Sequence, residues 1–141
     1  MNVLVDTPVW SLALRRKPTD LSVHEQALTE AFAELIREGR VETLGIIRQE
    51  VLSGIREEER CRKIRQSLRA FEDAVPETVD YEEAARMHNT CRGRGVAGSA
   101  IDLFICAVAQ RRNWQIFTTD RDFERYQRVL GIRLFWARHA E

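Results

Sequence analysis

The apolar run at residues 99–109, SAIDLFICAVA, constrains this chain more than any other segment, because it contains a single carboxylate, Asp102. If the run forms a helix, the positions three and four residues from Asp102 hold small or apolar residues, namely Gly98, Ser99, Ile105 and Cys106. We therefore expect this face to be buried. A carboxylate near a core is strongly unfavourable unless a cation, a proton or hydrogen bonds compensate it.

Two explanations for Asp102 are open at the level of sequence. Ser99 is a favourable N-cap residue, and Asp102 lies three positions later, where the acid of a capping box bonds the backbone N–H of the cap. This local explanation needs no function. A functional explanation requires further carboxylates at positions that the fold brings to the same point.

Length and composition indicate a single globular unit. Of the 141 residues, 44% are hydrophobic, and we expect one domain over residues 1–141. The 22 basic and 22 acidic residues give a formal net charge of zero. Bulk charge therefore identifies no partner, and binding of nucleic acid requires local basic patches.

The cysteines and the hydropathy pattern bear on location. Cys61, Cys91 and Cys106 are odd in number and lack C-x-x-C spacing, which argues against a disulfide framework and against a zinc site. The apolar run at residues 3–5 is too short for a secretory signal, and no run approaches the length of a membrane span. We expect a protein of the reducing cytoplasm with no membrane partner.

Short apolar runs alternate with helical patterns along the chain, which indicates an α/β domain with a mainly parallel sheet. Pro76 weakens the third of these runs as a strand, because proline cannot donate a ladder hydrogen bond. The expected strands are residues 2–5, 41–44, 75–79, 115–118 and 132–135.

Capping patterns predict where several helices begin. Ser22 and Glu25 form a capping-box pattern, and Asp80 with Glu83 is expected to cap a later helix. Residues 92–95, RGRG, are expected to form a flexible basic loop before the Asp102 helix. Further helices are expected over residues 46–55, 56–71 and 123–129.

Acidic residues follow two of the expected strands. Asp6 follows the first strand, and Asp120 and Asp122 follow the strand after the Asp102 helix. Parallel strands joined by right-handed crossovers end at one edge of a sheet, where ligands bind. Helices that start at this edge can present Glu50 and Asp102 to the same point, so we expect four or five carboxylates to converge there.

Such a cluster is unfavourable without a counter-charge. Two carboxylates about 4 Å apart repel by roughly 4 kcal/mol at an effective dielectric constant of about 20. All the candidate ligands are oxygens, so Mg²⁺ or Mn²⁺ is the expected ion. Such an ion lowers the pKa of a bound water and neutralises charge on a phosphodiester, and the pattern therefore predicts metal-assisted phosphodiester hydrolysis.

Four segments together resemble the motif blocks of the PIN domain, in the order and approximate spacing of the VapC toxins of bacterial VapBC toxin–antitoxin pairs. They are VLVDTPVW at residues 3–10, RQEVLSGI at 48–55, GSAIDLFICAVA at 98–109 and IFTTDRDF at 116–123. The resemblance spans nearly the whole chain, and no block acid is missing. It implies a PIN-like three-layer sandwich, with helices on both faces of a mainly parallel sheet of four or five strands.

The resemblance also implies roles for individual residues. By position, the catalytic acids are Asp6, Glu50, Asp102 and Asp120. All of these except Glu50 would bind metal, together with Asp122, whereas Glu50 would complete the ligand shell or orient the attacking water. Thr7 and Thr119 occupy positions where such proteins often carry a hydroxyl in the hydrogen-bond network of the active site.

The activity implied by the resemblance is that of a Mg²⁺- or Mn²⁺-dependent endoribonuclease acting on structured RNA such as tRNA or rRNA. The implied partner is a cognate VapB-like antitoxin, which inserts a C-terminal segment into the acidic groove. Homodimers, or larger complexes with the antitoxin, are usual in this family.

Several basic residues are candidates for binding RNA phosphates, although ordinary surface charge also explains each group. They are Arg15, Arg16 and Lys17 after the first helix, Arg92 and Arg94 in the glycine loop, and the pair Arg111 and Arg112. The three histidines are scattered and lie beside no plausible nucleophile, so the sequence does not support a histidine-based ribonuclease mechanism.

Two other functions are open. One is a PIN-like module that binds RNA or a protein without cutting, which the complete set of acids argues against. Metal-dependent cleavage that disappears in Asp6→Asn would exclude it. The other is a PIN nuclease of general RNA processing, and a neighbouring small reading frame encoding an antitoxin would favour the toxin over this alternative.

Overall fold

The apolar segment at the start of the chain lies inside a four-stranded, fully parallel sheet. The computed structural model describes residues 1–135, and within them the strand order is β3–β2–β1–β4. All three residues of β1 are buried, as expected for a strand that is covered on both faces. The strands are β1 (Val3–Val5), β2 (Val41–Leu44), β3 (Asp73–Ala74) and β4 (Gln115–Phe117).

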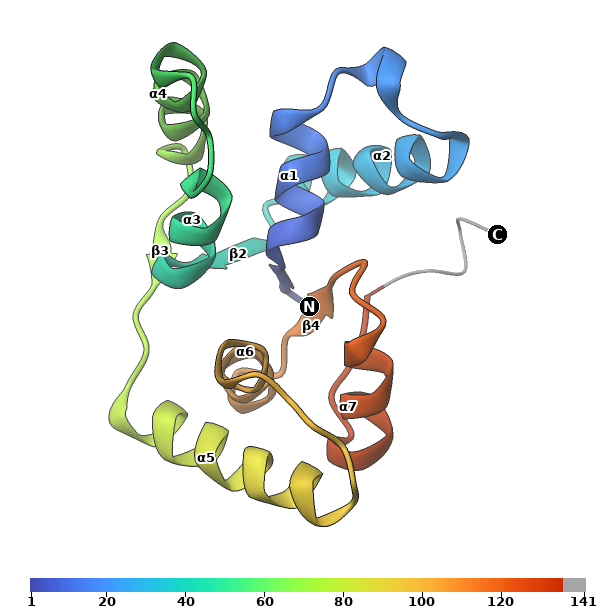
Figure 1. Cartoon of the computed structure of the whole chain (residues 1–141), viewed down its shortest axis with the longest axis vertical. Helices are drawn as coiled ribbons and strands as arrows, with labels where there is room; N and C mark the ends of the chain where they lie inside the picture. The colour runs from blue at the N-terminus through green and yellow to red at the C-terminus, as the bar shows by residue number, and fades with distance from the viewer. Residues whose placement is uncertain (136–141) are drawn as a thin grey trace.

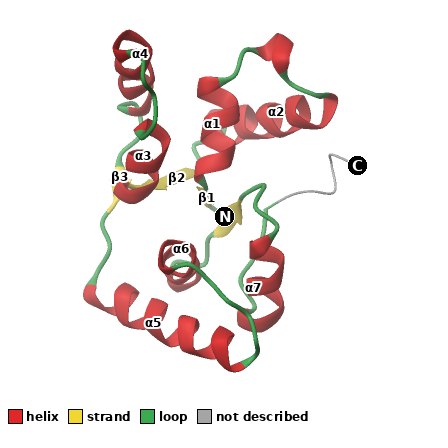
Figure 2. Cartoon of the chain, viewed as in Figure 1, coloured by secondary structure: helices red, strands yellow, loops and turns green. Residues whose placement is uncertain are grey.

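Helices cover both faces of the sheet (Figures 1 and 2). In the view of Figure 1, α1–α4 lie above the sheet and α5–α7 lie below it. The predicted α/β class, with a parallel sheet between two helical layers, is confirmed. The helices are α1 (Thr7–Arg15), α2 (Val23–Arg37), α3 (Gly45–Leu52), α4 (Glu58–Leu68), α5 (Thr78–Gly93), α6 (Ala100–Arg111) and α7 (Asp122–Leu130), with a short 3-10 helix, η1 (Pro18–Asp20).

The strand order identifies where the chain reverses direction across the sheet. The chain passes from β1 to β2 and then β3 through α1–α4, and returns through α5 and α6 to β4, on the other side of β1. The helices that follow β1 and those that precede β4 therefore lie on opposite faces (Figure 1). In open parallel sheets, the carboxyl ends of the strands at such a reversal line the ligand site.

Two predicted strands differ from the structure. The third strand lies at Asp73–Ala74 rather than at residues 75–79, because Pro76 cannot donate to the ladder and Val75 is 80% exposed. The expected fifth strand at residues 132–135 is reduced to a parallel bridge between Ile116 and Leu134. These residues lie beside β4, but they do not extend the ladder within the described part of the chain.

One predicted helix cap is confirmed and another is wrong. Ser22 accepts a hydrogen bond from the N–H of Glu25, and the Glu25 carboxylate accepts one from the N–H of Ser22, which completes the capping box of α2. Asp80 does not cap α5. It lies inside the first turn, where its carboxylate accepts a hydrogen bond from the N–H of Glu77 at 2.7 Å, so Glu77 is the cap.

Residues 92–95 do not form the predicted flexible loop. Helix α5 continues through Gly93, and the chain leaves it at Arg94 and at Gly95, whose φ of +77° suits glycine. Helix α6 then begins at Ala100 after the cap residue Ser99. Its apolar run is buried as predicted, at Leu103 and from Ile105 to Ala109.

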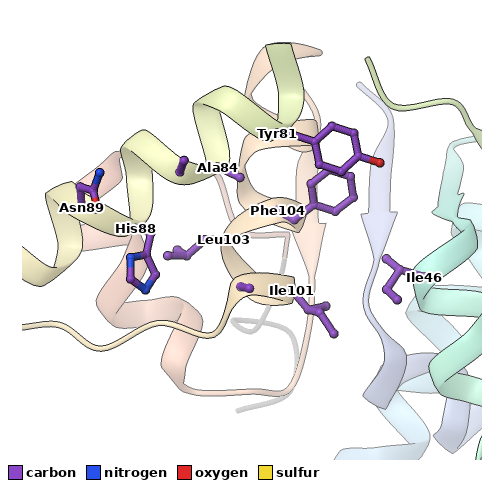
Figure 3. A pocket seen from close by; sticks show the side chains of 10 residues that line it. Ile46, Tyr81, Ala84, His88, Asn89, Ile101, Leu103 and Phe104 are labelled. Carbon is purple, nitrogen blue, oxygen red and sulfur yellow. The ribbon is translucent and has the colours of Figure 1, made fainter. Parts of the chain in front are cut away.

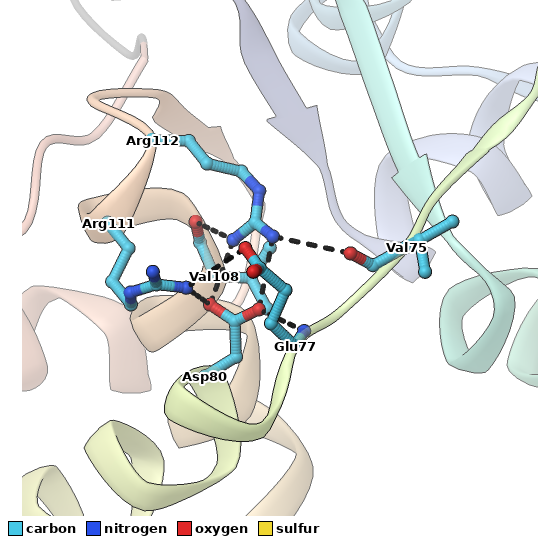
Figure 4. A network of polar contacts seen from close by, with 6 residues as sticks. All are labelled: Val75, Glu77, Asp80, Val108, Arg111 and Arg112. Atoms are coloured by element: carbon cyan, nitrogen blue, oxygen red, sulfur yellow. Dashed lines mark hydrogen bonds and ion pairs between the residues drawn. The ribbon is translucent and has the colours of Figure 1, made fainter.

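A buried ion-pair network joins α5 to the end of α6 (Figure 4). Asp80 is fully buried and accepts hydrogen bonds from Arg111 at 2.6 Å and from Arg112 at 2.9 and 3.0 Å. Burial alone would raise the pKa of Asp80, but hydrogen bonds from Arg112, from the N–H of Glu77 and from Arg111 outweigh it and hold the pKa well below its usual range. Arg111 and Arg112 thus bind Asp80 within the protein, which is neither ordinary surface charge nor the phosphate contact considered as the other explanation.

Within residues 1–135, none of the helices combines the length and the apolar character that crossing a membrane requires.

Replacing Asp80 by asparagine should destabilise the protein by about 3 kcal/mol, because two guanidinium groups lose their carboxylate. The free energy of unfolding is measured by urea denaturation. Since the pKa of Asp80 is lowered in the folded state, its contribution is present at neutral pH and is lost as the pH falls below about 4. The exposed pair of Glu34 and Arg37 provides the control: Glu34→Gln should change stability by about 0–1 kcal/mol. An equal effect of the two variants would contradict the network's role.

Candidate active site

The pairing of β1 with β4 brings together the acids that follow them. Val5 pairs with Phe117 at the carboxyl ends of these strands, and the N–H of Asp6 donates to the carbonyl of Phe117 at 2.9 Å. Asp6 and the segment containing Asp120 and Asp122 therefore leave the sheet at the same edge. This edge is the reversal point of the strand order.

Asp6 is almost buried, with 5% of its surface exposed. Its Oδ2 accepts a hydrogen bond from the hydroxyl of Thr118 at 2.7 Å, and the same hydroxyl oxygen accepts one from the N–H of Asp120 at 3.0 Å. Thr118, rather than the predicted Thr119, therefore connects the two acids. Thr119 is exposed and lies one position further along the turn.

Three carboxylates form a group that can hold a cation. Asp102, Asp120 and Asp122 each offer one oxygen, and these oxygens all lie within 4.8 Å of one another. At this separation two unit charges repel by about 3 kcal/mol at an effective dielectric constant of about 20. The group does not include Asp6 or Glu50, but it does include Asp122.

Backbone geometry in the turn after β4 sets the position of two of these acids. The N–H of Asp122 donates to Oδ1 of Asp120 at 2.9 Å, so the turn folds back on the Asp120 carboxylate. Asp122 is the first residue of α7 and forms an ion pair with Arg125 one turn later. An acid in the first turn of a helix is favoured by the helix dipole.

Asp102 lies in the first turn of α6, three residues after the cap. Its N–H donates to the hydroxyl of Ser99 at 3.0 Å, while its Oδ2 accepts a hydrogen bond from the hydroxyl of Tyr126 at 2.9 Å. Burial raises the pKa of Asp102, the Tyr126 hydrogen bond partly offsets this, and the charges of Asp120 and Asp122 raise it further. The Ser99 hydroxyl caps α6, but the predicted capping box is incomplete, because the carboxylate of Asp102 accepts from Tyr126 and not from the N–H of Ser99. Asp102 also lies among other acids, as the functional explanation requires.

Glu50 approaches the site from α3. Its Oε1 accepts a hydrogen bond from the hydroxyl of Thr7 at 2.9 Å, so Thr7 contacts one of the predicted catalytic acids. Thr7 follows Asp6 directly, and the charge of Glu50 acts on Asp6. Glu50 therefore lies on the Asp6 side of the acidic cluster and outside the group of three carboxylates.

The pKa of Asp6 is raised from 3.8 to about 6. Burial is the main cause, hydrogen bonds from Thr118 and from the backbone of Thr7 partly offset it, and the charges of Asp102 and Glu50 raise it further. A cation beside these carboxylates would reverse the effect of the neighbouring charges. All the donors are carboxylate oxygens, which suits a hard ion such as Mg²⁺ or Mn²⁺.

The basic candidates lie in different places. Arg15 and Arg16 line a cavity of about 630 Å³ that also contacts Pro8 and Thr119, so it lies next to the acidic cluster. Arg60 of α4 lines the same cavity, and its guanidinium donates to the carbonyl of Arg15. Lys17 is exposed at the start of η1 and does not line this cavity.

Arg92 and Arg94 are exposed at the end of α5, and Arg92 lines a separate cavity of about 310 Å³ with His88 and Gly98. Neither side chain lines the cavity beside Thr119.

Sequence reasoning did not identify three residues of the site: Thr118, Tyr126 and Arg60. Thr118 follows the last residue of β4. The sequence T-T-D at residues 118–120 could have indicated it, because either threonine could face the acids. Tyr126 lies four positions after Asp122, a spacing that places both on one face of a helix. Nothing local marks Arg60, because its helix joins the site only through tertiary packing.

Residues 3–129 match the family model of the PIN domain, and no curated protein sequence matches the chain. The chain is similar in structure to FitAcB from Neisseria gonorrhoeae, with a TM-score of 0.75 and 19% identity over 95% of this chain and 96% of that chain. VapBC2 from Rickettsia felis, bound to a DNA fragment from their promoter, gives a TM-score of 0.74 and 16% identity over 95% and 97%. VapBC-1 from nontypeable Haemophilus influenzae gives 0.69 and 17% over 100% of both chains. At these identities the similarity shows the fold.

Asp6→Asn should stabilise the metal-free protein at alkaline pH relative to the wild type. Because the folded-state pKa of Asp6 is raised to about 6, the wild type loses about 2–3 kcal/mol of stability as the pH rises from about 4 to about 8. The variant lacks this loss. Urea unfolding in EDTA across this range measures the difference, with Glu34→Gln as the control. A difference between Asp6→Asn and wild type that stays constant with pH would contradict the raised pKa.

Proposed function

This chain belongs to the PIN-domain family, and on that premise we propose that it is a metal-dependent endoribonuclease, the VapC-type toxin of a toxin–antitoxin pair. PIN domains are nucleases. The observation that carries the proposal is the group formed by Asp102, Asp120 and Asp122, with Asp6 and Glu50 beside it. Among these five acids only Asp122 forms an ion pair within residues 1–135, with Arg125, so the other four have no cationic partner, which favours a ligand role over a stabilising one.

Asp102, Asp120 and Asp122 would hold a Mg²⁺ or Mn²⁺ ion, and the four acids Asp6, Glu50, Asp102 and Asp120 would be catalytic. A bound ion of this kind lowers the pKa of a water molecule that it binds and neutralises negative charge on a phosphodiester. Asp6 would also contribute to metal binding, because the hydroxyl of Thr118 forms hydrogen bonds with both Asp6 and Asp120.

Glu50 would orient the attacking water and accept its proton, since it lies outside the group of three carboxylates and is held by Thr7. The hydroxyl of Thr7 fixes one carboxylate oxygen of Glu50, which leaves the other for a water molecule. Thr118, whose hydroxyl donates to Oδ2 of Asp6, would be the hydroxyl of the active-site network in place of the predicted Thr119.

The substrate would be structured RNA such as tRNA or rRNA. The cavity beside Thr119 supports this, because Arg15, Arg16 and Arg60 place positive charge next to the acidic cluster, where flanking phosphates of a bound strand would lie. Glu25 also lines the cavity and interacts with Arg16 at 3.8 Å. Lys17, Arg92 and Arg94 would contact RNA further from the scissile bond.

The partner would be a VapB-like antitoxin that inserts a C-terminal segment into the acidic groove, and the pair would act in the cytoplasm. The similarity of the fold to chains of FitAcB, VapBC2 and VapBC-1 supports this proposal.

We also propose a homodimer formed through an exposed apolar face on α5, α6 and α3 (Figure 3). Tyr81 of α5 is 58% exposed and stacks on Phe104 of α6, with ring centroids 4.7 Å apart. These two rings line a cavity of about 570 Å³, which Ile46 of α3 and Ile101 of α6 also line. An apolar face of this kind marks a protein interface on a soluble domain.

The nuclease proposal predicts metal-dependent cleavage of RNA. Purified, antitoxin-free protein should cut total bacterial RNA with Mg²⁺ or Mn²⁺, leave 5′-phosphate and 3′-hydroxyl ends, and be inactive in EDTA. Asp102→Asn should lower the rate more than about 100-fold, since loss of a ligand costs more than loss of its hydrogen-bond partner. Glu34→Gln is the control and should cut normally.

Cleavage that survives EDTA or the Asp102 substitution would contradict the acidic cluster as the catalyst. No cleavage of any RNA by folded, metal-loaded wild type would favour the alternative of a non-cleaving PIN-like module.

The dimer proposal predicts that Tyr81→Glu dissociates the protein. A charge at the centre of an apolar interface is desolvated without a partner, so light scattering after gel filtration should show a monomer. Val23→Glu is a matched control, because Val23 is 84% exposed at the start of α2, outside the apolar face. A monomeric wild type at micromolar concentration would contradict the proposal.

A further inference from the structure

The hydroxyl of Tyr126 connects α7 to the central acid of the site. Tyr126 is buried, with 1% of its surface exposed, and its hydroxyl donates to Oδ2 of Asp102 on α6 at 2.9 Å. A phenylalanine would supply the same apolar ring to the core. The hydroxyl therefore needs an explanation of its own, and its partner is the carboxylate of Asp102.

Two contacts restrict the ring of Tyr126. It forms an edge-to-face pair with Phe123, with ring centroids 5.2 Å apart and planes at 74°. It also lies against the chain at Gly98, where an added Cβ would be 3.2 Å from Cε1 of Tyr126 and 2.9 Å from Cδ1 of Leu103. The absence of a side chain at residue 98 thus allows the ring to approach the start of α6. Because the ring is held in this way, its hydroxyl has a defined position.

Helix α7 also carries a second acid of the group. Asp122 lies four residues before Tyr126, so both side chains leave the same face of the helix. Asp122 offers one of the three clustered oxygens, and its N–H donates to Asp120 at 2.9 Å. Helix α7 therefore bears on all three carboxylates. It carries Asp122, binds Asp120 through a backbone N–H and binds Asp102 through the hydroxyl of Tyr126.

We propose that Tyr126 is a positioning residue that sets the rotation of the Asp102 carboxylate toward a divalent cation shared with Asp120 and Asp122. The inference rests on the proposed metal-dependent function. A hydrogen bond to one carboxylate oxygen restricts rotation about χ2 of Asp102 before the cation arrives. Hydrogen-bond partners of metal ligands act in this way, and their loss lowers metal affinity or activity by 10–100-fold.

The proposal differs from a purely structural role in what it predicts for metal binding. A hydroxyl that only satisfies a buried hydrogen bond would change the stability of the metal-free protein and leave the affinity for metal unchanged. A positioning hydroxyl changes the affinity itself. It also leaves the maximal rate of cleavage recoverable, since a high concentration of metal ion compensates for weaker binding.

The test compares Tyr126 with Thr29, whose hydroxyl donates to the carbonyl of Gln26 within α2. Tyr126→Phe and Thr29→Val each remove one hydroxyl and keep the shape of the side chain. Titration calorimetry with Mn²⁺ alone measures the dissociation constant for the full chain, and urea unfolding in EDTA checks that each variant is folded. Tyr126→Phe should bind Mn²⁺ about tenfold more weakly than wild type, whereas Thr29→Val should match wild type.

RNA cleavage at rising Mn²⁺ provides a second readout. Tyr126→Phe should need about tenfold more Mn²⁺ to reach half of its maximal rate, and that maximal rate should approach the wild-type value. If Tyr126→Phe binds Mn²⁺ as tightly as wild type, the positioning role is overturned and the proposed nuclease stands. If wild type itself binds no Mn²⁺ and cuts no RNA, the proposed function fails, and the inference fails with it.

Discussion

The parallel pairing of β1 with β4 is the constraint on which the site depends. It places the first strand beside the last one. Asp6 and Asp120 are more than a hundred residues apart in the sequence, yet both form a hydrogen bond with the hydroxyl of Thr118. Both strands are almost wholly apolar and buried, and their burial stabilises an edge that collects like charges. The core therefore supports an arrangement that would be unfavourable alone.

Features set by local sequence could be predicted. The run VLV before Asp6 and the run QIF before the T-T-D turn predicted strands followed by acids, and the Ser22 pattern predicted a capping box that forms in full. The continuous apolar run around Asp102 predicted the buried helix α6. Each of these depends on residues within one or two turns or along one strand, where periodicity and capping preferences act.

Features set by distant contacts could not be predicted. The choice between Thr118 and Thr119 depends on where β4 ends, which shifts the facing hydroxyl by one position. The hydrogen bond from Tyr126 spans 24 residues, and the ion pairs of Asp80 span 31 and 32. The sequence shows that these side chains can form ion pairs, but it does not show which residue is the partner. Phosphate binding and surface charge were therefore the explanations open for Arg111 and Arg112, and the pairing with Asp80 was not foreseen. The strand at β3 is two residues long, too short for any periodicity to mark it.

Asp80 and the acids at the sheet edge differ in how their charge is compensated. Asp80 is fully buried, yet two arginines of α6 compensate it and lower its pKa. In residues 1–135, neither Asp6 nor Asp102 forms an ion pair with an arginine or lysine, and the pKa of each is raised. Asp80 lies near one end of α6 and Asp102 lies in its first turn, about 14 Å away along the helix from Arg111. The end of α6 thus supplies the two arginines that compensate Asp80 of α5, whereas the start of α6 carries the uncompensated Asp102, where the proposed cation would bind.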